Sequence, residues 1–265
     1  MAKWIPALVA LGLTAALGVS HLLGYLPVAV AAGVVVVAIA YGWPRLTDSP
    51  QPRITSAVLL AFGLLGMVTV WLIPSVPLLE WLPILAGMGL LWSFVQNLVR
   101  GIEASHAVAN VAAQVAGIVV ALAAASWVAG YRIPGDREAV VVGLVAIILA
   151  QIATSLPWPA RYTSPLAVVV AVLGAGAATV LYVGGGLHLL PGLLLGGVLG
   201  LLVAAVDRML GLIADSRFQA EHLAGSLTFE YAKAKARRAA VHLTIGAAPV
   251  ALGGIVVYVI GRIFV

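Results

Sequence analysis

Long apolar stretches, separated by short clusters of proline, glycine and charged residues, make up almost the whole chain. A helix that crosses a bilayer needs about 20 mostly apolar residues. The pattern therefore predicts an all-α fold, a polytopic transmembrane helix bundle that forms one integral membrane domain over residues 1–265. About nine spans are expected, at residues 5–24, 26–43, 54–73, 77–98, 105–129, 138–157, 165–183, 188–206 and 240–262.

The positive charges predict how these spans are oriented. If the N-terminus is inside, eleven of the fourteen Lys and Arg residues fall on the cytoplasmic side. Membrane proteins concentrate Lys and Arg in cytoplasmic loops, and Trp and Tyr at the two interfaces. Most Trp and Tyr residues do fall at predicted span ends. We therefore expect the N-terminus inside and the C-terminus outside, since an eight-span model would move either Lys3 or the basic run KAKARR outside.

Composition agrees with a membrane setting. The chain is 63% hydrophobic and 9% charged, whereas soluble domains are about 25% charged. Its net charge of +5 is explained by the cytoplasmic loops, and no nucleic-acid-binding motif is present, so nucleic acid is not an expected partner. The absence of cysteine excludes disulfides, thiolate metal sites and a cysteine nucleophile. The first apolar stretch has no small-residue cleavage site, so we expect it to be retained as a span.

One charged segment, residues 207–239, interrupts the apolar pattern between the eighth and ninth spans. Apolar residues recur there at steps of three and four, which predicts a cytoplasmic, basic, amphipathic helical segment. Its apolar stripe can lie in the membrane interface or dock on the protein's own spans. The segment ends in a basic run, which either anchors the ninth span or binds anionic lipids of the inner leaflet or a protein partner. That run holds Lys233, Lys235, Arg237 and Arg238.

Polar residues gather at one end of the fourth and fifth spans. No Asp, Glu, Lys or Arg lies at the middle of any predicted span, which lowers the expectation of an ion-coupled transporter. Spacings of three and four place the polar residues of the fifth span on one helix face. They can line a cytoplasm-facing cavity, or join helices by hydrogen bonds between amides. The candidate cavity residues are Glu103, His106, Asn110 and Gln114, with Gln96, Asn97 and Gln151 from neighbouring spans.

Other motifs point to packing rather than to chemistry. Gly192, Gly196 and Gly200 repeat every fourth residue, which predicts a helix-packing face within the chain or between subunits. The five histidines show no metal-ligand spacing, so neither a metal nor a cofactor is expected. No GxSxG motif, paired prenyl-transfer aspartates or phosphatase signature occurs, which makes an enzyme the least favoured class.

The Ala–Val–Gly–Leu-rich composition and the stretch AYGWPRL, Ala40 to Leu46, resemble multi-pass membrane proteins of actinobacteria that have no assigned function. The resemblance implies a bacterial plasma membrane and transfers no site residues. Two functional hypotheses follow from the sequence. The first is a permease-like protein that handles a small or lipidic substrate through a cavity between the fourth, fifth and sixth spans. The alternative is a non-catalytic subunit or scaffold of a larger envelope or respiratory complex, which docks through residues 207–238. The partner expectations are a protein partner or a homo-oligomer.

Overall fold

The computed structural model describes residues 4–73, 78–99, 104–132, 136–181, 187–223 and 230–264. The described residues form ten α-helices and no β-strand. In chain order the helices are α1 (Trp4–Leu23), α2 (Tyr25–Leu46), α3 (Pro52–Leu72), α4 (Trp81–Val99), α5 (Ala104–Ala123), α6 (Ala125–Arg132), α7 (Asp136–Ser155), α8 (Ala160–Leu181), α9 (Leu189–Leu223) and α10 (Glu230–Phe264).

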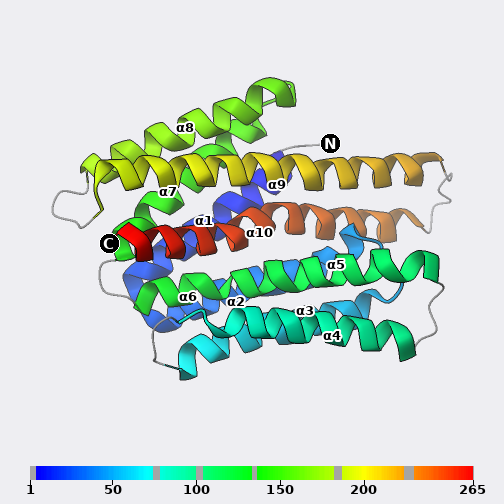
Figure 1. Ribbon diagram of the computed structural model, residues 1–265. Coiled ribbons are helices and arrows are strands. Elements are labelled where there is room, and N and C mark those ends of the chain that lie inside the picture. Colours follow the sequence, from blue (N-terminus) through cyan, green and yellow to red (C-terminus); the bar gives the residue numbers. More distant parts are fainter. Residues whose placement is uncertain are drawn as a thin grey trace.

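Within these described ranges, nine helical stretches are long and apolar enough to cross a bilayer. The predicted all-α, multi-pass transmembrane bundle is therefore confirmed. Successive spanning stretches run in opposite directions (Figure 1), so nine crossings place the start of α1 and the end of α10 on opposite sides. The side where α9 ends and α10 begins is the predicted cytoplasmic side, and it is called the inner side below.

The predicted fifth span, 105–129, is two helices rather than one. The helix pattern is interrupted at Ala124, where the amides of Ala124 and Trp127 donate to carbonyls only three residues earlier, at 3.3 Å each. Neither proline nor glycine marks this position. Instead, the indole Nε1 of Trp127 donates to the Val250 carbonyl of α10 at 2.9 Å. The hydrogen bond to α10 thus stabilises the Trp127 side chain beside the break at Ala124, and the local sequence gives no sign of this break.

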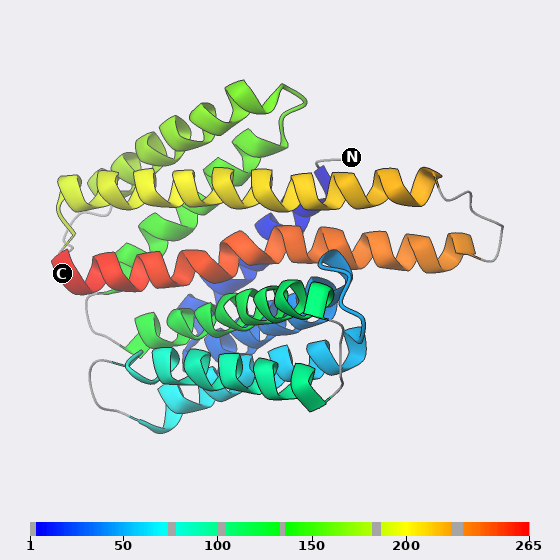
Figure 2. The ribbon, with the colours of Figure 1, turned by 45° about the vertical axis from the view of Figure 1, so that its right-hand side comes forward.

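The last two helices extend beyond the predicted ends of their spans, 206 and 240. Each is 35 residues long, or about 52 Å at 1.5 Å per residue, against about 30 Å of hydrocarbon. The charged segment 207–239 is therefore described as the inner end of α9, up to Leu223, and the start of α10, from Glu230. These inner ends project past α1, α7 and α8 in both views (Figures 1 and 2).

Helix α10 forms the centre of the bundle. It packs against α1, α2, α5, α6, α7 and α9, and 72% of its spanning window is buried. Glycines permit this close packing. A side chain at Gly42 of α2 would collide with the Ala240 carbonyl of α10, and a Cβ at Gly246 would lie 2.5 Å from the Pro6 carbonyl oxygen of α1.

Two groups of helices flank this centre. On one side α8 packs against α7 and α9, and on the other side α4 packs mainly against α5 and α3 (Figure 1). Helices α4 and α8 are peripheral, since only 22% of each spanning window is buried. Most of the surface of these two helices is therefore available to lipid.

The glycine stripe of α9 faces α8 within the same chain. A Cβ at Gly196 would lie 2.6 Å from the Ala171 carbonyl oxygen, and one at Gly200 would lie 2.8 Å from Val168 Cα. A Cβ at Gly192 would instead collide with the side chain of Thr179. The three glycines thus allow two backbones to approach closely at the outer half of the α8–α9 pair.

Replacing Gly196 with Ala should destabilise the protein by about 1–3 kcal/mol, because the new methyl group meets backbone atoms that cannot move aside independently. The free energy of unfolding, measured by SDS titration in mild detergent, checks this expectation.

Gly197→Ala is the matched control, since its Cβ would lie 3.6 Å from Val172 Cγ2, an ordinary contact distance. It should be neutral or stabilising, because alanine favours helix more than glycine does. Equal losses in both variants would contradict the close α8–α9 packing.

Candidate functional site

The polar residues at the inner ends of α4 and α5 pair with one another. Asn110 Nδ2 donates to Asn97 Oδ1 at 2.7 Å, and Gln114 Nε2 donates to Gln96 Oε1 at 2.9 Å. Asn97 Nδ2 also donates to the Ser93 carbonyl at 2.7 Å. Asn97 and Gln114 are 6% and 2% exposed. The structure therefore brings four of the seven candidate cavity residues together as two amide pairs that join α4 to α5.

The other three candidates do not join this cluster in the described structure. Glu103 lies outside the described residues, and so does the side chain of His106. Gln151 is buried in α7, which packs against α1, α8, α9 and α10. Its backbone carbonyl accepts a hydrogen bond from the Thr154 hydroxyl. Gln151 thus belongs to the opposite group of helices.

A groove of about 700 Å³ runs beside the amide pairs, between α4 and α5. Its wall is apolar except for one side chain, the amide of Asn97. This lining differs from the polar cavity that the sequence predicted, because the other amides are turned toward each other. The apolar wall consists of Leu90, Phe94 and Leu98 from α4 and Ala107, Val108, Val111, Ala112, Val115 and Ala116 from α5.

The groove is on the membrane-facing side of the two helices. Phe94, Leu98 and Val108 are 52%, 78% and 76% exposed, although they belong to stretches apolar enough to span a bilayer. A second, smaller apolar pocket of about 350 Å³ lies nearer the outer ends of the same pair, where Tyr258 of α10 also lines it. Side chains at these depths meet hydrocarbon rather than water.

The small residues of α5 create the groove. Ala112 and Ala116 are exposed and lie one turn apart, so no side chain fills the space beside Phe94. Sequence reasoning missed these positions because alanine is frequent everywhere in the chain. The four-residue spacing of Ala112 and Ala116 is the only local signal that could have identified them.

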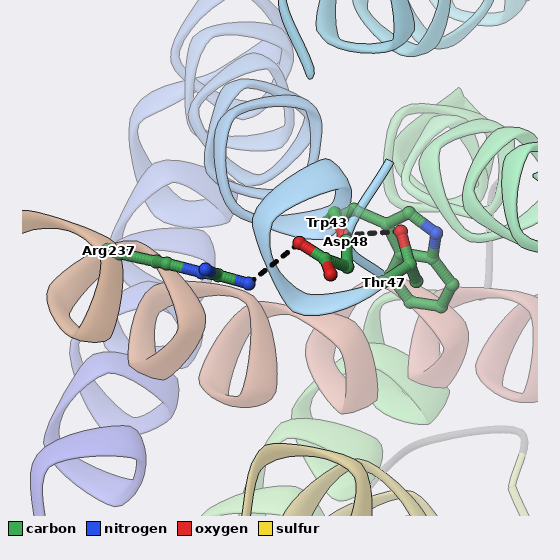
Figure 3. A network of polar contacts seen from close by, with 4 residues as sticks. All are labelled: Trp43, Thr47, Asp48 and Arg237. Atoms are coloured by element: carbon green, nitrogen blue, oxygen red, sulfur yellow. Dashed lines mark hydrogen bonds and ion pairs between the residues drawn. The ribbon is translucent and has the colours of Figure 1, made fainter. Parts of the chain in front are cut away.

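The basic run is partly occupied by contacts within the chain. Arg237 pairs with Asp48, which follows α2, at 2.8 Å (Figure 3). The guanidinium carbon of Arg238 lies 5.2 Å from the ring centroid of Phe218 in α9. Lys235 is exposed, and the side chain of Lys233 lies outside the described residues. Docking of lipid or protein by this run stays a prediction, and two of its members also hold helices together.

The partner of Arg237 has an unusual backbone conformation. Asp48 has a φ of 57°, in the left-handed region that favours glycine. It follows the end of α2, where both the amide and the hydroxyl of Thr47 donate to the Trp43 carbonyl at 3.0 Å (Figure 3). Because the pair is partly exposed, it contributes about 0–1 kcal/mol. The pair joins the α2–α3 connection to α10.

No protein-family model, curated protein or solved structure matches this chain. The resemblance to actinobacterial membrane proteins therefore stays a prediction.

The amide pairs should couple energetically. Asn110→Leu leaves Asn97 Oδ1 without its donor and should cost about 1–3 kcal/mol. The double variant Asn97→Leu with Asn110→Leu should cost less than the sum of the two single variants, by about 0.6 kcal/mol, the mean for such bonds in membranes. A double-mutant cycle of unfolding free energies measures this coupling.

Trp92→Leu serves as the control, because Trp92 lies on α4 and its side chain is 53% exposed. It should change the unfolding free energy much less. Additive losses at Asn97 and Asn110 would contradict the pairing.

Proposed function

We propose that this multi-pass membrane protein is permease-like and handles a lipidic substrate in the α4–α5 groove. The observation that carries the proposal is the groove itself, about 700 Å³ in volume, apolar, and open to the hydrocarbon core. Volumes of this size are typical of small-molecule sites. A bilayer presents acyl chains directly to such a groove, which supports a lipidic occupant.

The arrangement of amides supports a lipidic substrate over a small polar one. Three of the amides form hydrogen bonds with neighbouring side chains and do not line the groove, namely those of Gln96, Asn110 and Gln114. A polar solute in this groove would lose its bonds to water and gain few in return, which is costly. An acyl or isoprenoid chain loses nothing there.

Asn97 supplies a single polar anchor. Its Nδ2 carries two hydrogens and its Oδ1 two lone pairs, and one of each is used within the protein. One N–H and one lone pair remain for a ligand that reaches the inner end of the groove. We therefore expect an amphipathic lipid with a hydroxyl or carbonyl near Asn97 and its chain along Phe94 and Ala116.

The proposed membrane is the bacterial plasma membrane, with the α9–α10 connection in the cytoplasm. The concentration of Lys and Arg on that side supports this orientation, as does the resemblance of residues 40–46 to actinobacterial sequences.

A second candidate function is a non-catalytic subunit of a larger complex. It is favoured by the inner part of α9, which continues past α1, α7 and α8 (Figure 2) and where Met209 and Leu212 are 64% and 65% exposed. A partner protein that covers these side chains would dock on the inner side.

Native mass spectrometry of the protein, extracted gently with its lipids, tests the first proposal. The wild-type protein should retain a lipid that Ala116→Phe loses, because the new ring fills the groove. We expect bound lipid to fall about tenfold, equivalent to 1.4 kcal/mol of binding free energy.

Ala177→Phe is the control, since Ala177 is equally placed on an exposed face of α8, away from the groove. It should retain the lipid. A wild-type protein without bound lipid, or equal retention by both variants, would overturn lipid handling in this groove. A stoichiometric partner protein in place of lipid would favour the subunit.

A further inference from the structure

A separate cavity of about 330 Å³ lies on the inner side, where α1, α8, α9 and α10 meet. None of its lining residues comes from α4 or α5, so it is independent of the groove. Helix α9 supplies most of the wall, and Pro6 of α1, Ala160 of α8 and Ile245 of α10 complete it. Unlike the groove, this cavity is lined in part by charged side chains.

The packing of α8 and α9 explains why a cavity forms here. The two helices approach closely along the stripe from Gly192 to Gly200 and diverge toward the inner side (Figures 1 and 2). The cavity lies beyond the end of that stripe. Gly211 of α9 lines it, and a Cβ at Gly211 would have no atom within 4 Å. Divergence of the helices and a missing side chain together leave the space open.

The charges of the wall are mixed. Asp207, Gly211 and Asp215 are spaced by four residues, so they lie along one face of α9. Arg208 also lines the cavity. Two carboxylates and one guanidinium give a formal charge of −1, on a side where most of the chain's Lys and Arg are predicted to lie. The cavity therefore presents Asp215 as an acceptor for a cation beside Arg208 as a donor for an anion.

The cavity lies at the level of the lipid headgroups. Pro6 and Ala160 stand at the inner ends of two spanning stretches, Trp4–Leu23 and Ala160–Leu181. Leu212 belongs to the cavity wall and is 65% exposed. It continues the exposed apolar stripe of α9, in which Leu201 and Met209 are 63% and 64% exposed. A molecule in the cavity can thus extend directly onto a lipid-facing surface.

We propose that this cavity binds the headgroup of a zwitterionic aminophospholipid, a primary ammonium linked to a phosphate diester. The ammonium donates to the carboxylate of Asp215. The guanidinium of Arg208 donates to the phosphate, a geometry that arginine favours. The acyl chains lie along Leu212 and Met209.

The hydrogen-bond donors of the headgroup determine which lipid the cavity prefers. A primary ammonium offers three N–H groups to carboxylates, whereas the quaternary ammonium of a choline headgroup offers none. A glycerol headgroup has no cation for the Asp215 carboxylate. The cavity should therefore prefer phosphatidylethanolamine to both phosphatidylcholine and phosphatidylglycerol.

Native mass spectrometry of delipidated protein, titrated with each of the three lipids, measures this preference. Phosphatidylethanolamine should bind about tenfold more tightly than phosphatidylcholine, the effect of losing one charge-assisted hydrogen bond. Asp215→Asn should reduce this preference. Gly211→Leu should abolish phosphatidylethanolamine binding, because the side chain fills the cavity. A parallel titration with free O-phosphoethanolamine should show binding only at far higher concentration.

Gly12→Leu is the control for folding and for nonspecific lipid loss, since a Cβ at Gly12 also has no atom within 4 Å and Gly12 is exposed on α1. It should bind like the wild-type protein, and both leucine variants should keep the wild-type melting temperature. Equal affinity for ethanolamine and choline lipids, or full binding by Gly211→Leu, would overturn the proposal. Equally tight binding of free O-phosphoethanolamine would overturn its assignment to a lipid.

Discussion

The close packing of α10 is the constraint on which the rest of the bundle depends. In a bilayer, apolar side chains gain nothing by leaving lipid for protein, so van der Waals packing and hydrogen bonds must hold helices together. At the centre of α10, Gly246 meets α1 and the Val250 carbonyl accepts the Trp127 indole. A side chain at Gly254 would in turn lie 2.9 Å from Trp127 Nε1. These contacts tie α1 and α6 to α10, and the close approach at Gly42 adds α2, whereas α4 and α8 lie at the periphery.

Peripheral attachment explains where sites can form. Because α4 has little packing of its own, the amide pairs Asn97–Asn110 and Gln96–Gln114 fasten it to α5, and the alanines between them leave a groove open to lipid. On the opposite side, α8 packs closely against α9 along Gly192, Gly196 and Gly200, and the cavity with charged residues lies beyond these glycines. In both places space is left beside the points of closest helix contact. Both the groove and the cavity therefore result from how a peripheral helix packs against its neighbour.

Span number and helix class could be predicted from the sequence, because a spanning helix must hide its whole backbone inside about 20 apolar residues. The glycine stripe of α9 and the shared polar end of α4 and α5 could be predicted too, since both depend on spacings of three and four. Three features could not. The break at Ala124 lies beside a tertiary contact of Trp127. The apolar groove depends on which side chain each amide bonds to. The length of α9 and α10 depends on their pairing beyond the membrane. Each of these features depends on how two helices pack, and the spacing of residues within one helix does not reveal that.

Spin-label accessibility at Ala112 in liposomes tests most directly whether the α4–α5 groove is filled by lipid rather than water. The chain has no cysteine, so Ala112→Cys gives one label site inside the groove. Ala177→Cys on α8 and Lys235→Cys on α10 provide lipid-exposed and water-exposed references. A lipid-filled groove predicts that the label at Ala112 collides with oxygen, as at Ala177, and is shielded from a water-soluble nickel chelate. Accessibility to the chelate approaching that at Lys235 would mean a water-filled cavity, and would contradict the lipidic substrate.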